Sequence, residues 1–170
     1  IAEWIWERTR FESVVPASPR DGLRAWYELD GNLTDISGNF RNGRLLKGDV
    51  SWNAGPVNRA ADLDASMHLR FPSGVLDSGK PFSMAFWYRI GRQKASTMFR
   101  QQQGAQFFEI GFDEPETLPR LRRGHHITLR WQQSPGKELI VRSTARALQD
   151  KLYHCTVTFD GSNAAIFLDG

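Results

Sequence analysis

Residues 82–90 decide the fold, and they read Phe-Ser-Met-Ala-Phe-Trp-Tyr-Arg-Ile. Large apolar or aromatic side chains fill every second position from Phe82 to Ile90. The positions between them form the opposite row: Ser83, Ala85, Trp87 and Arg89. Because successive side chains of a strand point to opposite faces of its sheet, this alternation predicts a strand with one face in a core. Such a strand is typical of an antiparallel sheet that is covered on one side.

Short segments with strand character lie on both sides of this stretch, separated by turn residues. They are 23–29, 44–47, 50–53, 60–64, 66–71, 97–101, 106–112, 126–132, 139–143, 153–159 and 164–168. The 15 Gly and 8 Pro of the chain supply the turns that many short strands need. About a dozen such strands predict an all-β protein, an antiparallel β-sandwich of jelly-roll type. Only 145–150 offers a short helix within this region.

Residues 1–22 differ from the rest of the chain. The apolar residues Ile1 and Trp4 fall near helical spacing between charged residues. The segment 13–22 then carries two prolines and a turn-like Arg-Asp-Gly, which are signals of a linker. We therefore expect 1–22 to be a helix end and linker from a preceding region, and 23–170 to be one domain. We also expect a piece of a longer protein, because the chain begins without Met and ends within a predicted hairpin.

The charge of the chain gives little bias toward any partner. There are 22 basic and 19 acidic residues, for a net charge of +3. The basic run 120–123 follows the acidic run 113–116, as in a solvated loop rather than a phosphate-binding track. We therefore expect no nucleic-acid partner. No apolar run approaches the roughly 18 residues of a membrane helix, so no membrane span is predicted in this segment.

The single cysteine, Cys155, excludes an internal disulfide. It alternates with Tyr153 and Val157 along one apolar row. A buried cysteine in such a row behaves as a small hydrophobic residue, so we predict an inert thiol.

Four blocks along the chain share a family pattern. They are 25–39, which ends in Asp-x-Ser-Gly-Asn and leads on to Asn-Gly; 55–64, Gly-Pro-Val-Asn-Arg-Ala-Ala-Asp-Leu-Asp; 81–89; and 152–170, with Tyr-His-Cys-Thr-Val-Thr-Phe-Asp-Gly-Ser. In this order they resemble the laminin-G-like jelly-roll domains of the concanavalin A-like lectin/glucanase superfamily. Three positions depart from that pattern: Asn58, Leu63 and Leu152.

The resemblance carries several implications. It implies a concanavalin A-like sandwich in a multidomain protein with an extracytoplasmic location, that is, secreted, periplasmic or at the cell surface. It also implies closing strands beside the opening strand, and these are missing from the chain, so the domain is expected to be truncated at its C-terminus. Without them, 23–29 would be an open sheet edge.

Asp30, Asn32 and Asp35 form the candidate metal site. Calcium takes six to eight oxygen ligands, and this loop offers carboxylate, amide and carbonyl oxygens. Many members of the resembled superfamily carry calcium, so the resemblance favours the same cofactor here. The alternative is that these side chains cap their own turns through hydrogen bonds to the backbone.

Trp87, Arg89 and Trp131 are the candidate ligand-binding residues. An exposed aromatic ring stacks on the face of a sugar, and polar neighbours bind its hydroxyls. We group Trp87 with Arg89, and Trp131 with Arg130 and Gln132. The alternative is that both tryptophans pack in the sandwich, where tryptophan is usually well buried. The adjacent His125 and His126 are predicted to point to opposite faces, so they do not share one metal ion.

A glycoside hydrolase is the enzymatic alternative, because glucanases share the resembled superfamily. A retaining enzyme needs two carboxylates about 5–5.5 Å apart, which on a strand requires acidic residues on one face. The glucanases of the resembled superfamily carry Glu-x-Asp-x-x-Glu or Glu-x-Asp-x-Glu on one strand, and no such strand occurs here. Asp62 and Asp64 alternate in a block that the resemblance makes structural, so no catalytic residue is assigned. We therefore predict a non-catalytic binding module of a larger exported or cell-surface protein that recognises carbohydrate or a protein surface. A structural spacer without a ligand is the second hypothesis.

Overall fold

A computed structural model describes residues 22–63, 67–72, 74, 80–91, 96–113 and 124–170. Within them, every regular element is a strand. The all-β prediction is therefore confirmed for this part of the chain. The helix end and linker predicted for 1–22 lie, except for Gly22, outside the described residues.

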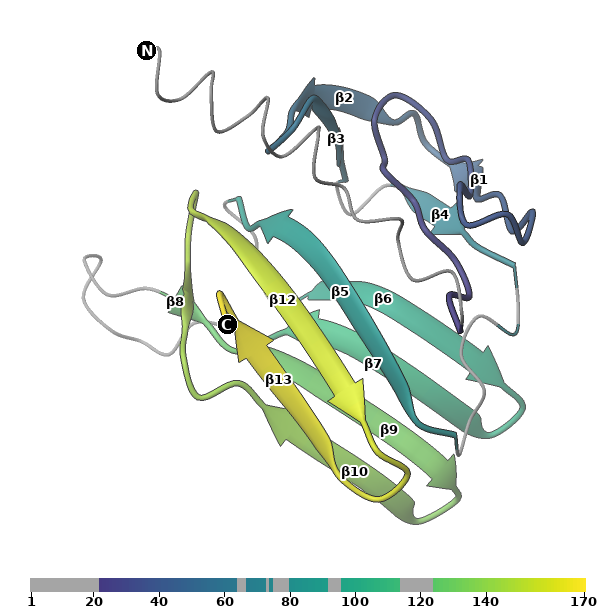
Figure 1. Ribbon diagram of the computed structural model, residues 1–170. Helices are drawn as coiled ribbons and strands as arrows, with labels where there is room; N and C mark the ends of the chain where they lie inside the picture. The colour runs from purple at the N-terminus through teal and green to yellow at the C-terminus, as the bar shows by residue number, and fades with distance from the viewer. Residues whose placement is uncertain (1–21, 64–66, 73, 75–79, 92–95, 114–123) are drawn as a thin grey trace.

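Two antiparallel sheets form the body of the protein (Figure 1). The three-stranded sheet has the order β13-β12-β5, with bounds Ala164–Leu168, Leu152–Phe159 and Phe82–Arg89. The four-stranded sheet has the order β10-β9-β7-β6, with bounds Lys137–Arg142, Ile127–Ser134, Gln106–Phe112 and Ser96–Gln103. Figure 1 shows the first sheet lying across the second, which is the predicted β-sandwich.

The core fills the space between these two sheets, because each sheet turns its apolar row inward. Trp131 of the four-stranded sheet meets Phe159 of the other with ring centroids 3.9 Å apart. Phe82 lies 5.1 Å from Phe108 and 5.7 Å from Trp131, again across the two sheets. Cys155 is fully buried here, which confirms the buried thiol. Burial raises the pKa of this thiol to about 11, so it stays protonated at neutral pH.

Short ladders complete the fold on either side of the sandwich. They pair β1 (Arg44–Lys47) with β4 (His68–Arg70), β2 (Ser51–Ala54) with β3 (Arg59–Asp62), and β8 (Gly124–His125) with β11 (Ala147–Leu148). The helix considered for 145–150 does not form, because Ala147 is buried and pairs with His125. The strand predicted for 23–29 is also wrong, since this segment makes only one isolated bridge, from Tyr27 to Asp35.

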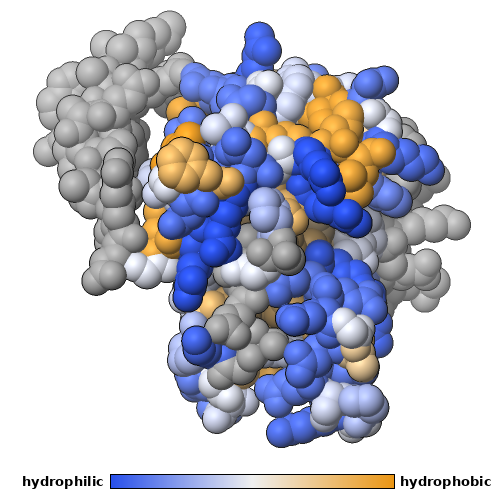
Figure 2. All heavy atoms as spheres, turned by 90° about the vertical axis from the view of Figure 1, so that its right-hand side faces the viewer, coloured by the Kyte–Doolittle hydropathy of each residue, from blue (hydrophilic) through white to orange (hydrophobic). Residues whose placement is uncertain are grey.

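Exposed apolar side chains gather on the part of the molecule formed by residues 22–63 and 67–71. Figure 2 shows them in orange in its upper half, level with β1 to β4 in Figure 1. Phe40 is 88% exposed and has a positive φ of 56°, a conformation that side chains other than glycine adopt at a cost. Val57, Leu46 and Ile36 are also exposed. In the described residues, no helix is long and apolar enough to cross a membrane.

Tyr88 offers a first prediction about the core. Its hydroxyl is buried and has no hydrogen-bond partner among the residues that the structure describes, while its ring stacks on that of Tyr153 at 5.9 Å. An unsatisfied buried polar group lowers stability by about 1–3 kcal/mol. We expect Tyr88→Phe to leave the free energy of unfolding unchanged or to raise it by about 1 kcal/mol. Urea denaturation of the two proteins measures this, and a clear loss of stability would reveal a partner for the hydroxyl.

Candidate functional site

The outer face of the three-stranded sheet carries the exposed aromatic residues of the sandwich. Trp87 of β5 is 56% exposed and Phe167 of β13 is 47% exposed. Between them lies β12, whose His154 is paired with Trp87 in the sheet register and has its ring centroid 4.9 Å from the indole. Thr156 of β12 is paired with Phe167. We call this surface, defined by Trp87, His154, Thr156 and Phe167, the outer strip.

The register explains why these side chains share one surface. Phe82, Met84, Phe86 and Tyr88 face the core, so the alternate residues of β5 face outward. In β12 the core-facing row consists of Tyr153, Cys155, Val157 and Phe159, so its alternate residues also face outward. The strip follows from the alternation that also builds the core.

Polar groups that bond to none of the described residues border the aromatic rings. The side chains of Ser83, Thr156 and Thr158 make no hydrogen bond to any described residue, and neither does the guanidinium of Arg89. Arg89 lies two residues after Trp87 on the same face, about 7 Å further along the strand. These groups are therefore open to a ligand at the surface.

The strip ends in an open hollow of about 490 Å³. Its walls include Pro81, Ser83, Thr158, Asp160 and Asn163. The Asp160 carboxylate accepts hydrogen bonds from the N–H groups of Ser162 and Asn163, which holds the hairpin turn that forms one wall. The outer face thus runs from Arg89, past Trp87 and Thr156, to a hollow bordered by hydroxyl groups.

Trp131 does not belong to this surface. It is 2% exposed and lies on the inner row of β9 with Ile127 and Leu129. The prediction grouped it with Arg130 and Gln132, but the strand directs those two side chains to the opposite face. The candidate residues therefore divide: Trp87 and Arg89 share the outer face, whereas Trp131 packs in the core.

The three candidate metal ligands each bind the backbone or a neighbouring side chain. Asp30 accepts hydrogen bonds from the Arg59 N–H at 3.0 Å and from the Asn58 amide at 2.9 Å. Asn32 accepts one from the Thr34 N–H at 2.8 Å. These bonds join the loop to Asn58 and to Arg59, the first residue of β3, and close a local turn.

Asp35 holds the same loop from the inside. It is 6% exposed, and its Oδ1 accepts hydrogen bonds from the N–H groups of Trp26 and Ser37, both at 2.9 Å. Its Oδ2 accepts one from the Arg41 N–H at 3.0 Å. Its own N–H donates to the Asn42 side chain at 2.9 Å. Burial by itself would raise the pKa of Asp35, but these N–H donors outweigh it and lower the pKa to about 2.

These hydrogen bonds bear on the calcium prediction. In the described residues, no group of three or more His, Cys, Asp and Glu side chains is arranged to hold a metal ion. A calcium ion at Asp30 or Asp35 would have to share oxygens that already accept N–H donors. We expect the melting temperature to be the same in calcium and in EDTA. A rise of several degrees in calcium that Asp30→Asn removes would instead establish the site.

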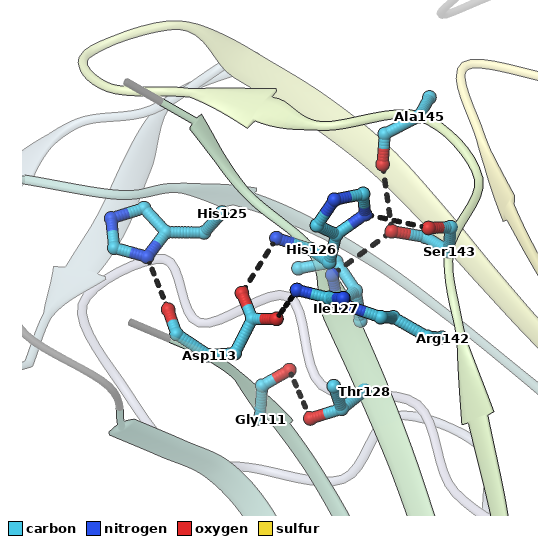
Figure 3. Close-up of polar contacts among 9 residues, drawn as sticks. All are labelled: Gly111, Asp113, His125, His126, Ile127, Thr128, Arg142, Ser143 and Ala145. Atoms are coloured by element: carbon cyan, nitrogen blue, oxygen red, sulfur yellow. Dashed lines mark hydrogen bonds and ion pairs between the residues drawn. The ribbon is translucent and has the colours of Figure 1, made fainter. Parts of the chain in front are cut away.

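A second polar cluster joins the ends of β7, β9 and β10 (Figure 3). The Asp113 carboxylate accepts a hydrogen bond from the His126 N–H at 2.9 Å and forms an ion pair with Arg142. The Nδ1 of His125 lies 2.5 Å from the Asp113 carbonyl oxygen, and that of His126 lies 2.7 Å from the Ser143 carbonyl oxygen. The two imidazoles thus contact different backbone carbonyls.

This cluster has no local sequence pattern, because its partners are far apart along the chain. It connects strand ends, and its Ser143 hydroxyl accepts the Ile127 N–H at 3.0 Å and donates to the Ala145 carbonyl at 2.7 Å. Other carboxylates of the four-stranded sheet are also paired: Glu109 lies 2.6 Å from Arg100, and Glu138 lies 3.3 Å from Arg130. Such pairing suits structural roles for these acidic residues.

Comparison with known proteins places this sandwich in a family. A laminin-G-type model of the concanavalin A-like lectin/glucanases superfamily matches residues 63–170. The chain belongs to that superfamily, as the sequence blocks predicted.

One solved structure has a similar fold: domain 4 of AbnA, a GH43 extracellular arabinanase from Geobacillus stearothermophilus, in complex with arabinotriose. The TM-score is 0.67 at 20% sequence identity, over 86% of this chain and 70% of the other. At this identity the likeness concerns the fold alone. No curated protein matches the chain.

Proposed function

We propose that this chain is a non-catalytic carbohydrate-binding module and that the outer strip is its binding face. The observation that carries the proposal is the exposed Trp87 ring, set beside His154 and flanked by hydroxyl groups that bond to no residue the structure describes. A sugar ring offers an apolar face for stacking and hydroxyls for hydrogen bonds, and the strip offers both counterparts. The arabinotriose bound to the similar domain of AbnA supports the same class of ligand.

The proposal extends to the protein that contains this chain. Residues 23–170 are the binding module, and 1–22 connect it to a preceding region. The parent protein is exported or displayed at the cell surface, where glycans are available to such a module. The extracellular source of the similar domain supports this location.

Trp87→Ala tests the binding face. We expect it to weaken binding at least about tenfold, because an aromatic anchor at the centre of a site contributes about 2 kcal/mol or more. The melting temperature should change little, because this ring is mostly exposed. Intrinsic fluorescence and calorimetric titration with arabinotriose, xylotriose, cellotriose and tetragalacturonate measure the affinities, and Trp87→Phe should retain part of the binding.

Two controls separate this site from the alternatives. Ile140→Ala removes an exposed apolar side chain from the four-stranded sheet and should leave binding unchanged. If Trp87→Ala binds as well as the parent protein, the site lies elsewhere. If none of the four sugars binds at millimolar concentration, the spacer hypothesis replaces the binding module.

A further inference from the structure

We infer that the outer strip is selective for an acidic glycan, whose carboxylate is bound by Arg89 beside the ring stacked on Trp87. This inference rests on the proposed function, because it names the ligand class of the same face. The aromatic rings indicate a sugar but not its charge, and the charged residues along the strip supply that information.

Arg89 is the cation of this face without a carboxylate partner among the described residues. Lys151, just before β12, lies 3.9 Å from Asp169 and stacks over the Tyr153 ring at 4.7 Å. The other oxygen of Asp169 accepts the His154 N–H at 2.9 Å. The Asp169 carboxylate is therefore already engaged. Asp150 also lies near this end, since its N–H donates to the Ile90 carbonyl at 2.9 Å. No ion pair joins Arg89 to either carboxylate in the described part of the chain, so its guanidinium adds a positive charge to the face.

The position of Arg89 suits a ligand that lies on Trp87. The two side chains leave the same face of β5, and Leu152 is the residue paired with Arg89 on β12. A guanidinium carries a planar fork of donors that fits a carboxylate with two parallel hydrogen bonds. A sugar stacked on the indole would place a carboxylate substituent within reach of that fork. A neutral sugar leaves the guanidinium hydrated and gains nothing from it.

The charge along the strip also gives the ligand a direction. Arg89 lies at one end, whereas Asp160 and the hydroxyls of Ser83 and Thr158 lie at the hollow. An acidic sugar is favoured beside Arg89 and disfavoured beside the Asp160 carboxylate. The ligand class that fits is a linear glycan that contains uronic acid.

The test compares tetragalacturonate with its methyl ester, which has the same rings and no charge. We expect the acid to bind about tenfold more tightly than the ester, since a hydrogen bond to a charged group contributes about 1.5–3 kcal/mol. Arg89→Gln should remove this difference, so that the variant binds the acid and the ester about equally. Arg89→Lys should keep part of it, because the charge remains and the fork is lost. Raising the salt concentration should weaken binding of the acid alone.

The outcomes separate this inference from the proposed function. If acid and ester bind equally and Trp87→Ala weakens both, the acidic specificity is overturned and the binding face stands. Tight binding of arabinotriose without binding of the galacturonate has the same meaning. If neither uronate, ester nor neutral sugar binds, both proposals fail. Lys137→Gln, which removes an exposed charge from the four-stranded sheet, is the matched control for net charge.

Discussion

Asp35→Ala is expected to destabilise the protein by about 3 kcal/mol, because three backbone N–H groups lose their acceptor and hydrogen bonds to charged groups contribute about 1.5–3 kcal/mol each. The donors belong to Trp26, Ser37 and Arg41, which come from both sides of the loop. Asp35 and Ser37 are both buried, so without the carboxylate at least the Ser37 N–H is left in a buried place without its acceptor. Urea denaturation gives the change in the free energy of unfolding.

The control is Asp49→Ala, which removes an exposed carboxylate from the link between β1 and β2. It should change the free energy of unfolding by less than about 0.5 kcal/mol, as surface substitutions usually do. Asp35→Asn should fall between the two. It keeps one acceptor oxygen but places an amide N–H group against one of the backbone donors. Equal stability of Asp35→Ala and the parent protein would contradict the role given to this carboxylate.

The same carboxylate predicts a response to acid. The pKa of Asp35 is about 2 in the folded protein, against an ordinary value near 3.9 in the unfolded chain. A lowered pKa in the folded state stabilises the protein above the unfolded value, and this contribution is lost as the pH falls through the folded value. The stability difference between the parent protein and Asp35→Asn should therefore shrink between about pH 4 and pH 2. Urea midpoints at several pH values test this, and a difference that stays constant would contradict it.

The sandwich was predictable because its information is local. In residues 82–90 the large apolar side chains occupy every second position without interruption. The strand forms with Trp87 on its outer face and Phe86 on its core-facing side. The same rule placed β7 and β13 with the bounds expected from the sequence. The core-facing side chains of each strand are apolar, so the strand can be predicted without knowing which strands pair with it.

The opening segment shows where this rule fails. Residues 23–29 alternate too, yet Leu29 has a φ of 53° and only Tyr27 forms a bridge. What holds the segment is the distant Asp35 carboxylate, together with the Asn39 amide that donates to the Leu23 carbonyl at 2.8 Å. Hydrogen bonds between residues so far apart leave no local sequence pattern. Periodicity alone therefore predicted a strand where 23–29 forms a loop held by these bonds.

The candidate site was partly predictable for the same reason. Trp87 shares its row with Ser83 and Arg89, which indicated an exposed face, whereas Trp131 shares its row with Ile127 and Leu129. The apolar residues on the same face as Trp131 indicated that it is buried. The prediction instead gave weight to its sequence neighbours Arg130 and Gln132, which lie on the opposite face. The contributions of His154 and Phe167 depend on strand register, which sequence alone does not provide.

Trp131→Ala is expected to lower stability by about 3–5 kcal/mol, the usual range for removing a large aromatic side chain from a core. The indole contacts Phe159, Phe82 and Phe108, so its loss leaves a cavity between the two sheets that these rings cannot close without leaving their own packing. The melting temperature should fall by about 10 °C for a chain of this size.

Trp87→Ala is the matched control for that experiment, because it removes the same side chain from the outer face of the opposite sheet. It should lower the free energy of unfolding by less than about 1 kcal/mol, since most of the indole is already in water. The two substitutions are thus expected to have opposite effects. Trp131→Ala lowers stability, whereas Trp87→Ala weakens sugar binding in a protein that stays folded. If Trp87→Ala were as destabilising as Trp131→Ala, the Trp87 ring would be packed in an interface. That result would favour the spacer hypothesis over the binding face.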